Sequence, residues 1–465
     1  MRFLVFLLLV GLTACQPASN TADRPPNLVI IFTDDLGYGD LGTYGHPTIQ
    51  TPHLDRMAAE GMKFTQFYVG AAVCTPSRAA LLTGRLPVRS GMAGSSRQVL
   101  FPDSKLGLPA EEITIAELLK DQGYATAAVG KWHLGHLPEF LPTTQGFDTY
   151  FGIPYSNDMD RTVGGPWLDP KVWNEPKIES WNVPILRDVT EVERPANQHT
   201  ITRRYTEETI AFMEANQDAP FFVYLAHSLP HVPLFTDPTF KGHSARGLYG
   251  DVIEEIDWST GQIMQALERM DLDDNTLVVF TSDNGPWLTF REQGGSAGLL
   301  HEGKQSTWEG GMRVPTLAWW PGTITPTVEK ALATTMDLFP TAAAMSGAAL
   351  PDDRTYDGAS LLPLFSGETD SIRETVYYYR KQTLFAIRQG EWKAHFITQG
   401  SYQNSGNYTE HATPLLFNLD HDPGEQYNLA EAHPEILAKL TAAAEEHVAR
   451  TPPAASQLEA RIGDP

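Results

Sequence analysis

Two pairs of oxygen-bearing side chains stand at the ends of strand-like runs. Asp34 and Asp35 directly follow one apolar run, and Asp283 and Asn284 follow another. Because an open α/β sheet places its ligands at the carboxyl ends of its strands, we expect the four side chains to meet. Carboxylate and amide oxygens suit a hard divalent cation such as Ca²⁺, with Mg²⁺ as the alternative. Either pair alone is more often a turn or a helix cap, but together they predict a metal site.

A cysteine, Cys74, begins the most specific pattern of the chain. Residues Cys74 to Arg78 fit C-x-P-S-R, and a short apolar stretch leads from there to T-G-R at positions 83–85. A free cysteine before a helix is usually a small buried apolar residue. Motifs of five residues also recur by chance. The continuation to position 85 weakens both explanations and makes Cys74 a candidate functional residue.

Cationic and imidazole side chains follow further strand ends. Lys131 and His133 are two residues apart in an extended segment, so they share a face. His231 lies just past another strand, and Lys304 lies in a glycine-bounded loop. Any one of these residues alone is more often solvated or structural. Their joint occurrence, each after a strand, favours a single site.

The pattern at Cys74 resembles the signature of the sulfatase family. In that family a formylglycine-generating enzyme, or an anaerobic sulfatase-maturing enzyme, oxidises the cysteine to an aldehyde. The resemblance implies that Cys74 becomes formylglycine and that the maturing enzyme recognises it together with Pro76 and Arg78. It predicts a sulfuric ester hydrolase that acts on sulfate monoesters, either aryl sulfates or sulfated sugars, with a divalent metal.

The resemblance covers nearly all of the chain from Asn27 to Leu429 and is nearest the branch of arylsulfatase A and N-acetylgalactosamine-6-sulfatase. It implies metal ligands at Asp34, Asp35, the modified Cys74, Asp283 and Asn284. It implies a sulfate pocket lined by Arg78, Lys131, His133, Ser156, His231 and Lys304. After Ser401 a Tyr402-Gln403 pair replaces a histidine-containing segment of arylsulfatase A. That departure leaves the natural substrate open.

The resemblance also implies a mechanism. The oxygens of a sulfate ester repel a nucleophile, so cations and the metal must neutralise them. The hydrated aldehyde offers two hydroxyls: one attacks sulfur, and the other collapses to expel sulfate. Asp283 would help deprotonate the attacking hydroxyl, and His133 would take the proton during collapse. His231 or Lys304 would protonate the departing alkoxide.

Two alternatives remain open from the sequence. A phosphomonoester or phosphonate-ester hydrolase of the same alkaline-phosphatase-like superfamily would share the fold and the metal site. A non-catalytic binding protein for sulfated glycans would keep the pocket but leave Cys74 unmodified.

The pattern of the chain predicts an α/β fold that can position these residues. Five runs are apolar on both faces, as strands sandwiched between helices should be, and lie at 27–33, 125–130, 220–226, 276–281 and 314–319. Runs with helical spacing separate them, at 51–60, 113–122, 201–216 and 250–270. We expect an alkaline-phosphatase-like sandwich, in which helices flank a large, mainly parallel sheet. The proline-rich stretch 167–197 is predicted to be a surface excursion.

The pattern changes after about Gly367. Closely spaced strands are expected at 375–379, 384–388, 391–397 and 414–418, followed by a helix at 434–450. They predict a small antiparallel sheet with one helix. We therefore expect a catalytic domain at 27–367 and a C-terminal α+β subdomain at 368–465.

The pattern of the N-terminal residues predicts an export signal. Arg2 precedes an apolar stretch, Phe3 to Val10, that is too short to span a bilayer. Residues 12–15 resemble the lipobox of bacterial lipoproteins, which predicts a signal peptide at 1–14, a lipid anchor at Cys15 and a tether at 15–26. The alternative is an ordinary secreted precursor with an incidental cysteine. We expect an exported protein of the periplasm or cell envelope that meets the membrane only through this anchor.

The overall charge excludes some partners. The 465 residues contain 34 basic and 57 acidic side chains, a net charge of -23. That balance opposes binding to nucleic acid or anionic lipid, so we expect no nucleic-acid partner. An anionic substrate such as a sulfated small molecule or glycan needs a local cluster of cations.

Overall fold

The computed structural model describes residues 24–401 and 408–464. The predicted signal peptide, Cys15 and the departure at Tyr402 lie outside these residues. In the part that is described, no helix combines the length and the apolar character needed to cross a membrane.

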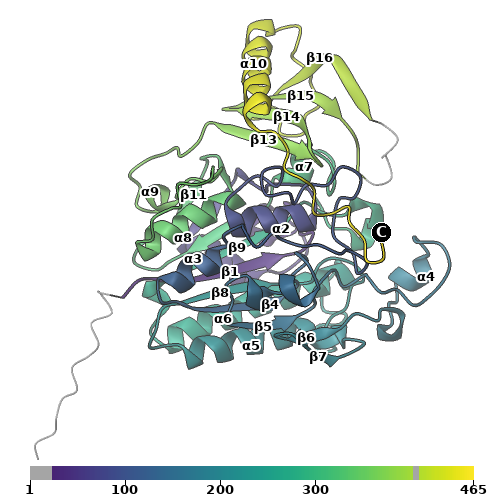
Figure 1. Ribbon diagram of the computed structural model, residues 1–465, viewed down its shortest axis with the longest axis vertical. Helices are drawn as coiled ribbons and strands as arrows, with labels where there is room; N and C mark the ends of the chain where they lie inside the picture. Colours follow the sequence, from purple (N-terminus) through teal and green to yellow (C-terminus); the bar gives the residue numbers. More distant parts are fainter. Residues whose placement is uncertain (1–23, 402–407, 465) are drawn as a thin grey trace, which may run out of the picture.

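A ten-stranded sheet forms the centre of the molecule (Figure 1). Its middle strands β9, β1, β8, β4 and β5 are parallel. The strands lie in the order β11 (Thr327–Glu329), β2 (Met62–Phe64), β10 (Thr316–Trp319), β9 (Thr276–Ser282), β1 (Asn27–Thr33), β8 (Phe221–Ala226), β4 (Ala125–Gly130), β5 (Thr149–Gly152), β6 (Ile185–Arg187) and β7 (Thr190–Glu193). The predicted fold class is confirmed.

Helices cover both faces of this sheet. Successive side chains of β1 point alternately into two cores, with Leu28 and Ile30 in one and Val29 and Ile31 in the other. The first core packs against α2 (Cys74–Thr83), α3 (Ile115–Asp121) and α8 (Leu338–Ser346), and the second against α1 (Pro52–Glu60), α5 (Ile201–Ala215) and α6 (Leu248–Arg269). Strands buried on both faces explain why the sequence shows continuous apolar runs.

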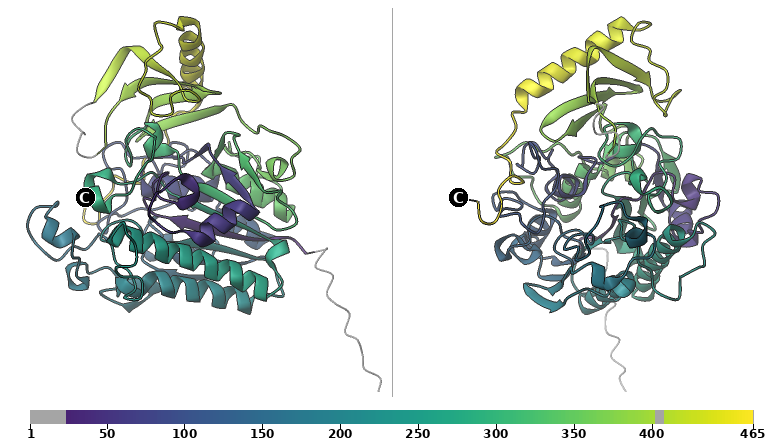
Figure 2. Two further views of the ribbon diagram at one scale, coloured as in Figure 1. Left: turned by 180° about the vertical axis from the view of Figure 1, so that it is seen from behind. Right: turned by 90° about the vertical axis from the view of Figure 1, so that its right-hand side faces the viewer.

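The C-terminal part forms a second layer above the sheet (Figures 1 and 2). It contains an antiparallel sheet of β13 (Thr375–Arg380), β14 (Thr383–Gln389), β15 (Trp392–Thr398) and β16 (Thr409–Asn418), with α10 (Pro434–Arg450) packed on it. After α10 the chain returns to the large domain, where Glu459 accepts hydrogen bonds from the backbone of Ser95 and Ser96. The proposed boundary between residues 367 and 368 falls between α9 (Leu362–Phe365) and β13.

The structure adds two details to the sequence prediction. The run at 314–319 forms β10, which pairs antiparallel with β9, so the sheet is mainly rather than wholly parallel. The stretch 167–197 is more than a surface excursion, because β6 and β7 lie within it and continue the sheet at one edge. β7 is mostly exposed, so it lacks the apolar run that marks the central strands.

Candidate active site

Cys74 lies at the first position of α2, and all ten residues of that helix are buried. The helix ends at Gly84, which has a left-handed backbone with φ of 67° and donates its N–H to the carbonyl of Ala80. A Cβ at Gly84 would lie 2.7 Å from Cβ of Phe339, so this turn needs glycine. The N-terminus of a helix carries partial positive charge, which favours negative charge at Cys74.

The two acidic pairs meet because β1 and β9 are neighbours in the sheet. Thr33 pairs with Ser282, so the residues that follow each strand come together. The backbone N–H of Asp35 donates to Oδ1 of Asp283 at 3.1 Å, and Nδ2 of Asn284 donates to Oδ1 of Asp35 at 2.7 Å. Asp35 has φ of 68°, a backbone conformation that costs energy outside glycine and is common at functional sites.

Three cations surround these carboxylates. Nζ of Lys131 donates to Asp34 and, at 3.1 Å, to Oγ of Ser156. Nη2 of Arg78 donates to Oδ2 of Asp283 at 2.8 Å. Nζ of Lys304 lies 2.8 Å from the carboxylate of Asp35. The strand ends thus carry a compact cluster of alternating charge.

The two histidines lie at the edge of this cluster. Nε2 of His133 lies 2.9 Å from the carbonyl oxygen of Leu100, which assigns the proton to that nitrogen. Nδ1 of His133 is buried without a hydrogen-bond partner, so it is placed to accept a proton. Nδ1 of His231 lies 2.6 Å from the carbonyl oxygen of Val232, and its Nε2 lies 3.7 Å from Asp35.

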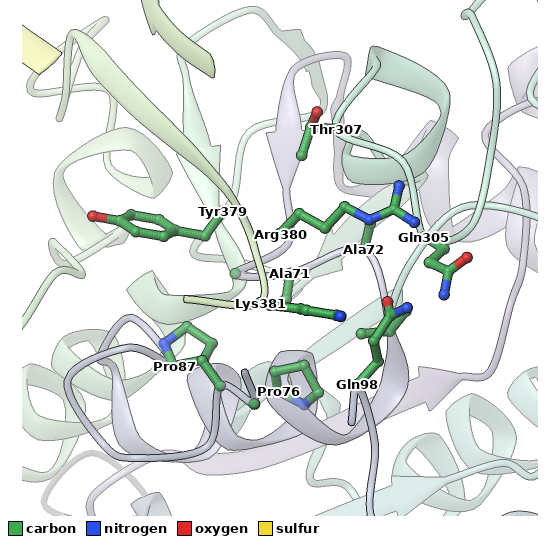
Figure 3. A pocket seen from close by; sticks show the side chains of 14 residues that line it. Ala71, Ala72, Pro76, Pro87, Gln98, Gln305, Thr307, Tyr379, Arg380 and Lys381 are labelled. Carbon is green, nitrogen blue, oxygen red and sulfur yellow. The ribbon is translucent and has the colours of Figure 1, made fainter. Parts of the chain in front are cut away.

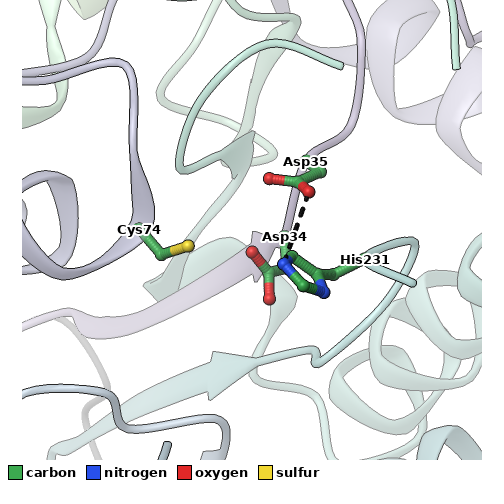
Figure 4. Close-up of side chains that lie close together, drawn as sticks. All are labelled: Asp34, Asp35, Cys74 and His231. Carbon is green, nitrogen blue, oxygen red and sulfur yellow. Dashed lines mark ion pairs between the residues drawn. The ribbon is translucent and has the colours of Figure 1, made fainter. Parts of the chain in front are cut away.

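The carboxylate and amide oxygens of this site fit a hard divalent cation. Asp34, Asp35, Cys74 and His231 each offer one ligand atom, and these atoms lie within 4.8 Å of one another (Figure 4). Oδ1 of Asp34 and Oδ1 of Asn284 are buried without a hydrogen-bond partner. A buried oxygen without a partner is costly, and a bound cation would satisfy both atoms.

Burial and charge set the pKa values here. Burial opposes ionisation of Asp34, but Lys131 and the other cations nevertheless hold its pKa well below the usual range. Burial and the neighbouring Asp34 raise the pKa of Asp283 to about 7. Burial raises the pKa of the Cys74 thiol to about 12, so the unmodified thiol is protonated at neutral pH.

All of the predicted site residues come together, and none is more than 3% exposed. Some neighbours were not foreseen from the sequence. Trp287 lies three residues after Asn284, with its ring 5.1 Å from that of His231 and 4.2 Å from Nζ of Lys304. The sequence did carry a signal for Trp287, because this aromatic residue closely follows Asp283 and Asn284. The contact between His133 and the carbonyl of Leu100 left no signal in the sequence, because any residue supplies a carbonyl.

A small hollow lies beside α2 (Figure 3). Arg380 and Lys381, at the turn between β13 and β14, extend toward Gln98 and Gln305 in this view. Its free volume is about 20 Å³, which is room for about one water molecule. This hollow is too small for a substrate.

Comparison with known proteins defines the class to which this fold and site belong. Residues 26–348 match the sulfatase family model, and residues 371–462 match that of the C-terminal region of aryl-sulfatase. The chain therefore belongs to the sulfatase family and is a sulfuric ester hydrolase.

Individual relatives agree over almost the whole chain. Human arylsulfatase A is 46% identical over 442 residues, which cover 90% of this chain and 86% of that protein. Human N-acetylgalactosamine-6-sulfatase is 41% identical over 469 residues, which cover 94% of this chain and 88% of that protein. The solved structure of Ps i-CgsB in complex with k-i-k-neocarrahexaose has a TM-score of 0.78 and 29% identity, and the match covers 94% of this chain and 95% of that one.

Proposed function

We propose that Cys74 is converted to formylglycine and serves as the nucleophile for hydrolysis of sulfate esters. The observation that carries this proposal is the place of Cys74 at the start of α2, beside Asp34 and Asp35. An aldehyde hydrate supplies a hydroxyl nucleophile, which the protonated thiol of a buried cysteine does not. The maturing partner is a formylglycine-generating enzyme or its anaerobic counterpart.

The strand-end oxygens hold the metal in this proposal. Asp34, Asp35, Asp283 and Asn284 offer the all-oxygen set that Ca²⁺ prefers and that Mg²⁺ also accepts. When bound, the cation supplies Lewis-acid stabilisation of negative charge. Arg78, Lys131 and Lys304 hold the sulfate group, and Ser156 orients it through its contact with Lys131.

Proton transfer is assigned to the groups around this cluster. Asp283, whose pKa is raised to about 7, helps deprotonate the attacking hydroxyl. Nδ1 of His133 is free of hydrogen bonds and accepts the proton released later in the cycle. Lys304 or His231 protonates the leaving oxygen.

We propose a sulfated glycan as the natural substrate class. N-acetylgalactosamine-6-sulfatase, by its name, acts on a sulfated sugar, and Ps i-CgsB is solved with an oligosaccharide. Aryl sulfates such as 4-nitrophenyl sulfate are useful reporter substrates, because their leaving groups depart with little help.

The test combines mass spectrometry with turnover. The peptide that contains Cys74 should carry an aldehyde in active protein, and Cys74→Ala should be folded and inactive. Cys15→Ala, which removes the other cysteine of the chain, is the matched control and should retain turnover in solution. Full activity from protein with only unmodified cysteine would overturn the proposal. Preference for 4-nitrophenyl phosphate over the sulfate would favour the phosphatase alternative.

We also propose that the protein is exported and anchored through a lipid on Cys15. The support is the short apolar stretch and the lipobox-like residues 12–15, which lie outside the described residues. In the native host the mature N-terminus should be Cys15, and Cys15→Ser should release the protein or block its processing. A mature N-terminus at another residue would rule this out.

A further inference from the structure

An aromatic series connects the proposed leaving-group side of the catalytic site with the surface. Trp287, which contacts His231 and Lys304, packs on Phe290 with ring centroids 4.7 Å apart. Phe290 packs on Trp173 at 4.7 Å, and Trp173 packs on Trp167 at 4.9 Å. Trp167 is 44% exposed. The series therefore begins beside the catalytic residues and ends in solvent.

A pocket of about 310 Å³ opens along this series. Its walls come from α4 (Pro170–Trp173), at the right edge of Figure 1, and from the 3-10 segment Leu288–Gln293. The lining includes Trp173, Asn174, Thr289, Phe290, Arg291 and Glu292. The volume is in the range of small-molecule sites, and the mixture of aromatic and polar side chains is typical of such pockets.

The polar part of the pocket contains two features that packing alone does not explain. Oγ1 of Thr289 is buried without a hydrogen-bond partner. Arg291 has φ of 53° and ψ of -109°, a strained backbone for a residue other than glycine. Strain of this kind is often found at ligand sites. Arg291 is exposed and, among the described residues, forms no ion pair, even with Glu292 in the same wall.

We propose that this pocket is a distal subsite for the substrate, which binds a pyranose ring with an acidic substituent further along the same sulfated oligosaccharide. Aromatic rings pack against the C–H faces of sugars, Asn174 and Thr289 supply hydrogen bonds to hydroxyl groups, and Arg291 pairs with a sulfate or carboxylate. In a protein with a net charge of -23, a cation without a carboxylate partner gives selectivity for an anion.

The position of the pocket argues that one glycan fills both sites. Phe290 lines the pocket and packs on Trp287 at 4.7 Å, and the Trp287 ring lies 5.1 Å from that of His231 and 4.2 Å from Nζ of Lys304. A short oligosaccharide covers a span of this size. This inference rests on the proposed glycan substrate. It adds a second place, away from the catalytic residues, at which the protein recognises that glycan. Small aryl sulfates are too short to reach it.

The experiment compares oligosaccharides of increasing length. Carrageenan oligosaccharides, whose acidic groups are sulfates, and chondroitin sulfate oligosaccharides, which also carry carboxylates, are tested as disaccharides and hexasaccharides. Binding to the Cys74→Ala protein is measured by calorimetry, and kcat/KM is measured with mature enzyme. For at least one series the hexasaccharide should bind about tenfold more tightly than the disaccharide. A gain with the carrageenan series shows that a sulfate is sufficient, whereas a gain with the chondroitin series alone identifies the carboxylate.

Two variants test whether this pocket causes the gain. The pocket variants are Arg291→Gln, in the wall itself, and Trp167→Ala, which removes the exposed ring packed on the lining residue Trp173. Each should remove most of the tenfold gain with length. Arg269→Gln, which removes one exposed arginine at the far end of α6, is the matched control and should keep it. A gain that survives in both pocket variants, or no gain with length in either series, overturns the subsite. Failure of wild-type enzyme to hydrolyse even 4-nitrophenyl sulfate would instead count against the proposed function.

Discussion

At the scale of single residues, the active site balances its charges closely. Asp34, Asp35 and Asp283 face Arg78, Lys131 and Lys304, three carboxylates against three cations. A sulfate monoester carries one negative charge, so this balanced set alone has little net attraction for it. A divalent cation gives the site the excess positive charge that an anionic ester requires. The charge balance and the unpartnered oxygens thus lead to the same expectation.

The metal site predicts a change in stability as well as in activity. Removal of metal by a chelator should abolish turnover and lower the melting temperature, and Ca²⁺ or Mg²⁺ should restore both. A cation at about 100 times its Kd stabilises the folded state by about 2.7 kcal/mol. Asn284→Ala removes one proposed ligand but no charge, and should reduce the Ca²⁺-dependent rise in melting temperature. Equal melting curves with and without metal in the wild type would contradict the site.

Leaving-group protonation gives a second prediction at this scale. Lys304→Ala should slow sugar or alkyl sulfates by about 10²- to 10⁴-fold, because their alkoxides need a proton as the bond to sulfur breaks. Nitrophenyl sulfate should slow less, because it loses only the contact of Lys304 with the sulfate group. His231→Ala should have a smaller selective effect, since Nδ1 of His231 already lies against the carbonyl of Val232.

The measurement for these variants is kcat/KM across a series of leaving groups. A steeper dependence of rate on leaving-group pKa identifies the acid, whereas loss of charge stabilisation alone slows all substrates more evenly. An unchanged slope in both variants would show that neither residue is the acid.

At the scale of elements, the buried central strands of the large sheet could be predicted from the sequence, but the strands toward its edges could not. β1 and β4 match their predicted bounds because each is an apolar run buried on nearly every residue. The convergence of Asp34 with Asp283 followed from the rule on strand ends. β7, with the sequence TEVE, is mostly exposed and has no such signal. The antiparallel direction of β10 depends on the connection before it, which local periodicity does not reveal.

The return of the C-terminal segment to the large domain was also missing from the sequence pattern. Glu459 accepts hydrogen bonds from three consecutive residues, Ser95 to Arg97, about 360 positions earlier in the chain. Burial opposes its ionisation, but the hydrogen bonds from Ser96 and its neighbours lower its pKa to about 2. A contact between such distant segments leaves no local periodicity to detect.

This contact predicts a dependence of stability on pH. Because the folded-state pKa of Glu459 is lowered from 4.5 to about 2, its stabilising effect is complete above about pH 4.5 and is lost as the pH falls toward 2. Because solvent screens this partly exposed carboxylate, Glu459→Gln should reduce the free energy of unfolding at pH 7 by only about 0.5–1 kcal/mol. In urea titrations, the difference from wild type should shrink below pH 4.5. Glu445→Gln, on the exposed side of α10, is the control and should show no such trend; a difference that grows in acid would contradict the assignment.

At the scale of the whole molecule, a buried ionic cluster joins the C-terminal subdomain to residues 304–309, the segment that carries Lys304. Nζ of Lys393, on β15, donates to the carboxylates of Glu309 and Glu425 and to the carbonyl oxygen of Thr307. The side chain of Glu309 also accepts hydrogen bonds from Tyr68 and Tyr378. Residues 304–309 form one short segment, so the subdomain fixes the chain that carries Lys304. The second domain therefore contributes to the site without lining it.

Replacement of Lys393 tests this connection. Lys393→Met leaves Glu309 and Glu425 buried without their shared cation, which should cost about 3–5 kcal/mol of stability. Glu425→Gln in the same chain removes one of the two carboxylates that share this lysine, so the double variant should be less destabilised than the sum of the single changes. Urea unfolding of the four proteins measures this coupling, with Lys439→Met on the exposed face of α10 as the control.

The same variants also separate positioning of Lys304 from simple loss of stability. At a temperature where circular dichroism shows every variant folded, Lys393→Met should still reduce kcat/KM for sugar sulfates more than for nitrophenyl sulfate, because a displaced Lys304 protonates the poor leaving group less well. The double variant should recover part of the kcat/KM for sugar sulfates. With Glu425 neutralised, Glu309 has one negative neighbour fewer, and residues 304–309 return toward their original position. Equal losses on both substrates would mean that the subdomain supports the fold but does not position Lys304.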